Sequence, residues 1–152
     1  MTPAAALTEL LTRVDLSVEP ELSTAEAVAA LAGTMRYKDR GATAVYGDFI
    51  AVGGRLYRCV WDGNTNATLP AVLGHTCLGR WVLDGTVQWE DMGPRPSSKY
   101  DFVGAMRRLY SLRVQRSAEL VNIGDKDSKL DIESLHDHWV KERAKLVIVR
   151  AV

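Results

Sequence analysis

Apolar residues recur at helical spacing toward both ends of the chain and at strand spacing in the middle. Near the N-terminus they are three or four residues apart from Leu7 to Val14, which predicts a helix over residues 3–14. Thr2 is the expected cap of this helix, with Pro3 at its first position. Farther on, Ser23-Thr24-Ala25-Glu26 has the capping-box pattern, in which the serine and glutamate side chains bond each other's backbone N–H groups. This pattern predicts a second helix over residues 24–35.

Two further helices are predicted after residue 98. A broad apolar stripe with a 3.6-residue period indicates the longest helix, over residues 99–122, with Ser97 or Ser98 as its cap. A shorter apolar pattern indicates a fourth helix over residues 132–146. The last residues, 145–152, are mostly apolar and β-branched, which predicts a C-terminal tail that docks on the fold or on a partner.

The middle of the chain, residues 43–92, has the composition of a small β module. Four runs there are rich in β-branched and aromatic residues, and turn sequences separate them. The runs are residues 45–52, 56–61, 81–83 and 86–89. Gly53-Gly54 joins the first two and Asp84-Gly85 joins the last two, and both dipeptides suit tight hairpin turns. The pattern therefore predicts an antiparallel sheet made of two hairpins.

Alternation along these strands predicts which side chains form the core of the module. In the second run, Tyr57, Cys59 and Trp61 share one face, while the other face carries a charged arginine. The face with Tyr57, Cys59 and Trp61 is therefore the expected core face. In the last run, Val87 and Trp89 share a face and are expected to join this core.

These elements predict an α+β fold. The chain has 152 residues, of which 47% are hydrophobic and 25% are charged, as in a soluble globular protein with one modest core. We expect a single domain over residues 1–152, with a helical core of about four helices and the antiparallel β module of residues 43–92 inserted into it.

Charge and targeting patterns exclude some classes of function. Nineteen basic and nineteen acidic residues balance, so the whole chain has no general attraction for nucleic acid. No apolar run approaches the ~20 residues that span a bilayer, and the N-terminus lacks the pattern of a secretory signal. No membrane contact is expected. Cys59 and Cys77 could form one disulfide, but a reducing cytoplasm favours free thiols.

Candidate catalytic and metal-binding motifs are weak. His136-Asp137-His138 has the residue types of a metal site, but on a helix His136 and His138 point to different sides. The chain also lacks a glycine-rich phosphate loop and a nucleophile-elbow pattern. We therefore expect no catalytic residue, no metal and no cofactor, and the protein is not expected to be an enzyme.

The tryptophans of the module allow two interpretations. Trp61, Trp81 and Trp89 could form a platform on which sugar rings stack, or they could fill the core of a module too small to bury enough other apolar surface. The core interpretation is the more common for a small sheet.

The third predicted helix is rich in arginine, and these residues also have more than one interpretation. They are Arg107, Arg108, Arg113 and Arg116. They could contact DNA phosphates, form intersubunit contacts in a ring, or serve as ion-pair and solubility residues.

The β module resembles one found in structural proteins of tailed bacteriophages. The residues that carry this resemblance are Tyr46-Gly47-Asp48, Gly54-Arg55-Leu56-Tyr57-Arg58-Cys59 and Asp84-Gly85-Thr86-Val87-Gln88-Trp89-Glu90, with Gly63 and Pro70 between them. In phage proteins the module occurs in necks, tails and fibres. The resemblance therefore implies a protein of the virion and leaves its position in the particle open.

The helices on both sides of the module are similar in organisation to head–tail connector (adaptor) proteins. That resemblance implies a homo-oligomeric, dodecameric ring beneath the portal, with the next neck or tail protein on its other side. DNA would pass through the lumen in transient, non-specific contact. The virion neck would be its final location, after synthesis in the host cytoplasm. By the same analogy the C-terminal tail would dock onto the portal through Leu146, Val147, Ile148, Val149, Arg150 and Val152.

Two other functions remain open. A carbohydrate-binding tail or fibre accessory protein would use the tryptophans of the β module, and it predicts that these side chains are exposed. An enzyme acting on cell-wall or nucleic-acid substrates predicts a concave pocket with carboxyl groups of perturbed pKa.

Overall fold

The computed structural model describes the backbone of residues 1–123 and 126–148, and the side chains of residues 1–121 and 132–146. The chain divides into two compact units. The helical unit comprises Met1–Thr34 and Tyr100–Val152, and the β unit comprises Met35–Lys99. The α+β class is confirmed, and the predicted β module of residues 43–92 lies within the β unit.

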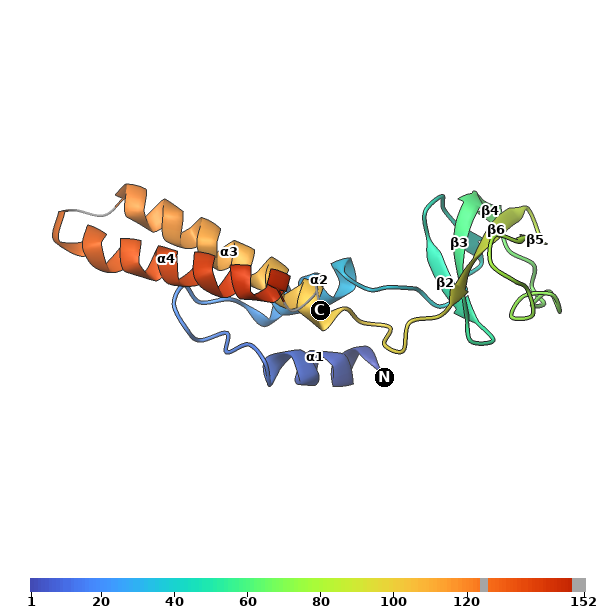
Figure 1. Cartoon of the computed structure of the whole chain (residues 1–152), viewed down its shortest axis with the longest axis horizontal. Helices are drawn as coiled ribbons and strands as arrows, with labels where there is room; N and C mark the ends of the chain where they lie inside the picture. The colour runs from blue at the N-terminus through green and yellow to red at the C-terminus, as the bar shows by residue number, and fades with distance from the viewer. Residues whose placement is uncertain (124–125, 149–152) are drawn as a thin grey trace. The chain divides into compact units, whose positions relative to one another are not determined.

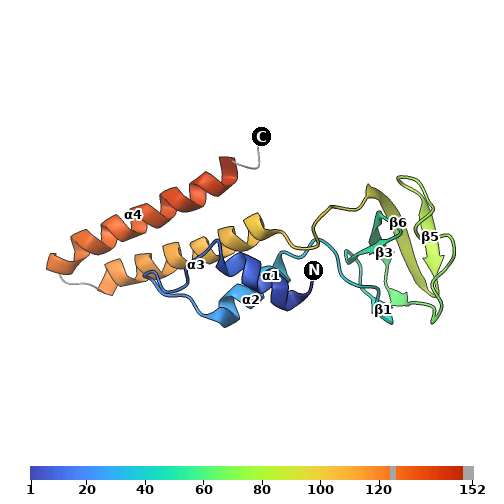
Figure 2. The same ribbon diagram turned by 90° about the horizontal axis from the view of Figure 1, so that it is seen from below.

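The helical unit contains four helices in the part of the chain that the structure describes. They are α1 (Pro3–Leu11), α2 (Thr24–Gly33), α3 (Phe102–Ile123) and α4 (Lys126–Ile148). α3 and α4 pack side by side as a hairpin, drawn in orange and red (Figure 1, Figure 2). Their antiparallel direction is seen in one contact, where Arg107 near the start of α3 donates to the backbone oxygen of Leu146 near the end of α4.

The first two helices begin where their capping sequences predict. The Thr2 hydroxyl accepts a hydrogen bond from the backbone N–H of Ala5 at 3.2 Å. Ser23 and Glu26 form the reciprocal capping box, each side chain bonding the other residue's backbone N–H. Both caps satisfy N–H groups that have no partner within the helix.

The later helices differ from the prediction at their boundaries. Asp101, rather than Ser97 or Ser98, supplies the carboxylate that accepts from Gly104 N–H at 3.0 Å, so α3 begins a few residues late. α4 begins at Lys126, ahead of the predicted start at residue 132. With 23 residues it is slightly longer than α3, which has 22. The sequence did not reveal the start of α4, because the polar residues there do not form an amphipathic helical pattern.

Few apolar side chains are buried in the helical unit among those at residues 1–34, 100–121 and 132–146. They are Ala6, Leu10, Val14, Leu22, Ala27, Ala30, Leu31, Tyr100, Ala105, Leu109 and Trp139. On α3 the buried positions recur every four residues, from Ala105 and Leu109 to Arg113 and Ser117. Two of these four buried residues are polar, so a search for apolar residues at helical spacing does not predict their burial.

The β unit contains a four-stranded antiparallel sheet and a short two-stranded ladder. Its strands are β1 (Thr43–Ala44), β2 (Phe49–Val52), β3 (Arg55–Trp61), β4 (Gly63–Asn64), β5 (Trp81–Asp84) and β6 (Val87–Pro94). The order in the larger sheet is β2-β3-β6-β5, and β1 pairs with β4 (Figure 1). Both predicted hairpins are present, as β2–β3 and β5–β6.

The two hairpin turns differ in how well they were predicted. Gly53 and Gly54 join β2 to β3 with φ of 57° and 80°, the left-handed values that a tight turn of this kind needs. Between β5 and β6, Asp84 pairs with Val87, so the turn consists of Gly85-Thr86 and not of Asp84-Gly85. Asp84 is thereby the last residue of a strand and is fully buried.

The core of the β unit corrects one prediction. Tyr57, Cys59, Val87 and Trp89 are buried as expected, but Trp61 is 68% exposed. The reason is a register shift between Cys59 and Trp61, which places one extra residue in β3 opposite β6. Such a bulge sends the following side chain to the other face of the sheet, and alternation alone does not reveal it.

Candidate functional site

The outer face of the four-stranded sheet, opposite the buried Tyr57 and Trp89, carries large exposed apolar side chains. Trp61 on β3 is 68% exposed, Trp81 on β5 is 59% exposed and Leu83 on β5 is 67% exposed. Side chains of this size are seldom exposed together without a ligand or a partner. We call the surface made by Trp61, Trp81, Leu83, Gln88, Glu90 and Arg58 the outer-face strip.

Strand register determines the arrangement of the strip. In one row, Trp61 pairs with Gln88, and Gln88 pairs with Leu83. In the next row, Arg58 pairs with Glu90, and Glu90 pairs with Trp81. Paired residues in an antiparallel sheet share a face, so the two indoles lie diagonally across β6 with polar side chains between them.

The separation of the two indoles follows from sheet geometry. Trp61 and Trp81 are two strands apart, at about 4.8 Å per strand. Along the strand direction they are two residues apart, which is about 6.8 Å. Their Cα atoms are therefore roughly 12 Å apart. The indoles can therefore contact two separate parts of one extended ligand.

Charge on the strip is internally balanced. The Arg58 guanidinium donates to Glu90 at 2.6 Å, and the two side chains are 39% and 23% exposed. The Gln88 amide can both donate and accept hydrogen bonds. The surface between the indoles is therefore polar and carries no net charge.

A buried ion pair supports one end of the strip from the core side. The Asp84 carboxylate accepts from Arg40 at 2.8 and 2.7 Å, from Asn66 N–H at 3.0 Å and from the Trp89 indole N–H at 3.3 Å. Burial alone would raise the pKa of Asp84, but these donors outweigh it and the pKa lies below its ordinary value. These hydrogen bonds tie β5 to Arg40, which precedes β1, and to Asn66, which follows β4.

A second buried ion pair supports the other end. Arg55 donates to Asp91 at 2.5 and 2.8 Å, and Thr76 donates to the same carboxylate at 2.5 Å. The pKa of Asp91 is lowered to about 2. The largest cause is the hydrogen bonding from Arg55, which outweighs the opposite effect of burial. Because a carboxylate only accepts, the Thr76 hydroxyl must accept in turn from Tyr57 at 2.6 Å.

This chain of hydrogen bonds continues into the loop before β5. The Tyr57 oxygen accepts from Gly74 N–H at 2.7 Å, so the loop carrying Gly74 and Thr76 is held to the core. The two networks cross-link the strands under the strip to the segments around them. The sequence identified neither network, because its partners are far apart along the chain.

The arginines of α3 lie in the helical unit, where three of them have intramolecular partners. Arg113 is 2% exposed; it donates to the backbone oxygens of Asp15 and Pro20 and stacks on Trp139 with 4.2 Å between guanidinium carbon and ring centre. Burial lowers the pKa of Arg113 from its ordinary value. This location contradicts a DNA or intersubunit contact for Arg113, since its guanidinium is inside the unit.

Arg116 and Arg107 also bridge elements of the helical unit. Arg116 pairs with Glu26 at the start of α2, and Arg107 donates to the Leu146 backbone oxygen at 3.4 Å. Arg108 differs because it is exposed. Its guanidinium lies against Gly33, the last residue of α2, where the partial negative charge of a helix end favours a cation.

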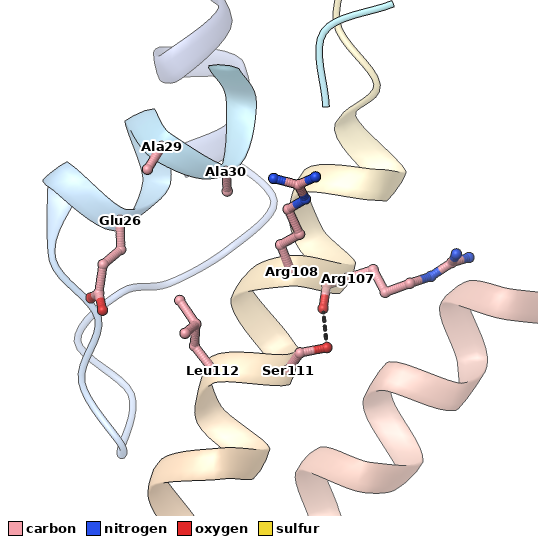
Figure 3. Close-up of a pocket in the computed structure, with 7 residues that line it drawn as sticks. All are labelled: Glu26, Ala29, Ala30, Arg107, Arg108, Ser111 and Leu112. Carbon is pink, nitrogen blue, oxygen red and sulfur yellow. Dashed lines mark hydrogen bonds between the residues drawn. The ribbon is translucent and has the colours of Figure 1, made fainter. Parts of the chain in front are cut away.

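A shallow groove of about 500 Å³ runs between α2 and α3 beside these arginines. Figure 3 shows Arg108 directed toward Ala30 on α2 and Arg107 directed toward the neighbouring helix. The full lining is Glu26, Ala29, Ala30, Arg107, Arg108, Ser111 and Leu112. The hydroxyl and the carboxylate in this lining both have partners: Ser111 donates to the Arg107 backbone oxygen at 2.8 Å, and Glu26 accepts from Ser23 and Arg116.

The proposed portal-docking residues are only partly within the described structure. Leu146 is half-buried in α4, and the backbone of Val147 and Ile148 continues that helix. Val149, Arg150 and Val152 lie outside the described residues.

Metal and thiol chemistry can be judged from the described side chains. Residues 1–121 and 132–146 contain no group of three His, Cys, Asp or Glu side chains that could hold a metal ion. His136 Nδ1 lies 3.2 Å from the Val114 backbone oxygen and 3.0 Å from the Ser117 hydroxyl, so it bridges α3 and α4. Cys59 is a buried free thiol and Cys77 an exposed one.

Neither membrane topology nor known relatives identify the site. Within the described part of the chain, none of the helices is both long enough and apolar enough to span a bilayer. No protein-family model, curated protein or solved structure matches the chain.

Proposed function

We propose that the protein is a structural subunit of a tailed-phage particle and forms a homo-oligomeric ring at the neck, against the portal. The observation that supports this proposal best is the sparse interior of α4. Among its side chains at residues 132–146, Trp139 is the only one that is buried. A long helix in water owes most of its stability to tertiary packing, and neighbouring subunits of a ring would supply packing that the monomer lacks.

The surface of α3 supports the same proposal. Leu120 is 42% exposed, and Val103, Met106 and Leu112 are only partly covered. In a ring, the groove between α2 and α3 would lie within reach of a neighbour, and Arg108, which is exposed beside the end of α2, would contact that neighbour or DNA. The resemblance of the β unit's sequence to phage structural modules supports the virion location.

The copy number of the protein in purified particles tests this proposal. We expect a ratio to the portal protein near one to one by quantitative mass spectrometry, because a ring stacked on the portal shares its symmetry. The major tail-tube protein, measured in the same sample, is the control for a component present in many copies. A ratio matching that control, or absence from the particle, would contradict a neck ring.

A truncation tests the docking tail separately. A chain ending at Leu146 should keep its helical circular-dichroism signal and its ring, yet no longer bind the portal in a pull-down. Normal portal binding by this truncation would contradict docking by the tail while leaving the ring itself intact.

A further inference from the structure

We propose that the outer-face strip binds an uncharged, extended oligosaccharide, with one pyranose ring stacked on Trp61 and another on Trp81. This inference goes beyond a role in the neck and does not depend on it. It rests on two exposed indoles placed on one sheet by strand register, with paired charges and an amide between them.

The chemistry of the indoles favours a sugar. A pyranose presents C–H bonds on its face and hydroxyl groups around its edge, so its face stacks on a flat aromatic ring while its edge remains polar. Trp61 and Trp81, at 68% and 59% exposed, offer such rings without any rearrangement of the core. Their Cα separation of roughly 12 Å, calculated from strand spacing, matches non-adjacent rings of one extended chain.

The polar residues between the indoles favour the same ligand. Gln88 and Glu90 lie on β6, which the diagonal between the indoles crosses, and both can hydrogen-bond hydroxyl groups at the sugar edge. Burial of the Gln88 amide against an apolar protein surface would leave it without a hydrogen-bond partner, which is costly. A partner protein with an apolar contact surface is therefore a poorer match than a hydroxyl-rich ligand.

Electrostatics narrows the class of glycan. Arg58 and Glu90 neutralise each other at 2.6 Å, so the strip between the indoles presents neither a positive nor a negative field. A polyanionic glycan or a nucleic acid would find no excess of cations here. The electrostatic match is to a neutral polysaccharide.

The bulge in β3 is the structural device that makes the site. If the pairing after Cys59 were regular, Val60 would lie opposite Gln88 and alternation would direct Trp61 toward the core face that carries Tyr57. The two buried ion pairs of Asp84 and Asp91 then hold the strands beneath the indoles in a fixed register.

The test is a binding titration of the full-length chain followed by tryptophan fluorescence and isothermal calorimetry. The probes are β-1,4-linked hexasaccharides of glucose and of N-acetylglucosamine, with polygalacturonate as the charged comparison. We expect at least one neutral probe to bind and to change the fluorescence of the exposed indoles, while polygalacturonate binds more weakly.

Variants distinguish sugar stacking from general apolar contact. Trp61→Ala and Trp81→Ala should each weaken binding by about tenfold or more, because each removes one stacking platform. Leu83→Ala is the comparison within the strip, since Leu83 is as exposed as the indoles but offers no ring. It should weaken binding less than either tryptophan variant does.

Three outcomes would overturn the proposal. The first is no binding of either neutral probe at millimolar concentration. The second is an equal loss with Leu83→Ala, which would indicate a protein surface. The third is self-association that disappears in the tryptophan variants, which would make a second copy the occupant. None of these binding results changes the copy number expected in particles, so the neck proposal is tested independently.

Discussion

Arg113 and Asp91 show charged residues used as interior residues. Each is almost fully buried, and each has hydrogen-bond partners that are distant in sequence. An unpaired charge in the interior would cost several kcal/mol, so burial of this kind requires complete partners. The arginine that the sequence offered as a DNA contact is therefore a residue that holds the α1–α2 connection against α3 and α4.

Asp91 gives a prediction about pH. Its pKa is lowered from 3.8 in the unfolded chain to about 2, so its contribution to stability is present above about pH 4 and is lost as the pH falls toward 2. Asp91→Asn should lower the free energy of unfolding by about 2 kcal/mol at pH 7, since a charge-assisted network is lost. The measurement is urea unfolding of both chains between pH 7 and pH 2.5.

The difference between the two chains should narrow below about pH 4, because the Asp91 carboxylate then binds a proton in the unfolded chain but not yet in the folded one. Glu90→Gln is the control at a partly exposed ion pair and should change stability by no more than about 1 kcal/mol. A difference between wild type and Asp91→Asn that widens on acidification would contradict the assigned partners.

At the scale of the element, the sheet depends on its turns. Gly54 and Gly85 both have positive φ, at 80° and 66°. They differ in their surroundings. A Cβ on Gly54 would meet nothing within 4 Å, whereas a Cβ on Gly85 would collide with the backbone oxygen of Asn64 on β4. One turn is open and the other is packed against a strand.

This contrast predicts different costs for the same substitution. Gly54→Ala should destabilise by about 1 kcal/mol through backbone strain alone. Gly85→Ala should destabilise by about 3 kcal/mol, because the collision adds to the strain. Thermal unfolding of the two variants measures the difference. Equal losses would show that β4 does not pack against the β5–β6 turn.

The sequence predicted elements well where local chemistry decides them. Thr2, the Ser23–Glu26 box and the Gly53-Gly54 turn act within a few residues, and each lies where it was predicted. The bulge before Trp61 and the start of α4 were missed, because a bulge depends on pairing with β6 and a polar helix start has no amphipathic pattern.

The candidate site was predictable in its residues but not in its geometry. The sequence drew attention to Trp61, Trp81 and Trp89 as a group. It could not separate the buried Trp89 from the two exposed indoles, since register is a property of paired strands. The exposed pair becomes visible only when β3, β6 and β5 are placed side by side.

At the scale of the whole molecule, the two ends of the inserted β unit lie next to each other. Arg36 N–H donates to the Lys99 backbone oxygen at 2.8 Å, so the two ends of the inserted segment meet. Insertions with adjacent ends can be removed without separating the elements that flank them. The helical unit also has its own buried interior.

Excision of the β unit is therefore predicted to leave a folded helical protein. A chain in which residues 37–98 are replaced by Gly-Gly should show a higher helical fraction by circular dichroism and should unfold cooperatively. By the proposals above it should still form a ring and should bind no oligosaccharide. A chain that loses cooperative unfolding would show that the helical unit depends on the β unit.

The bulge in β3 also has a consequence for how this protein changes over generations. Deletion of Val60 would place the indole directly after Cys59, where regular alternation also directs it outward, opposite Gln88. The exposed face can therefore persist in a shorter chain that has no bulge, whereas regular pairing at the present length would turn the indole inward. Among related chains, an outward indole is thus compatible with either length of β3 at this point.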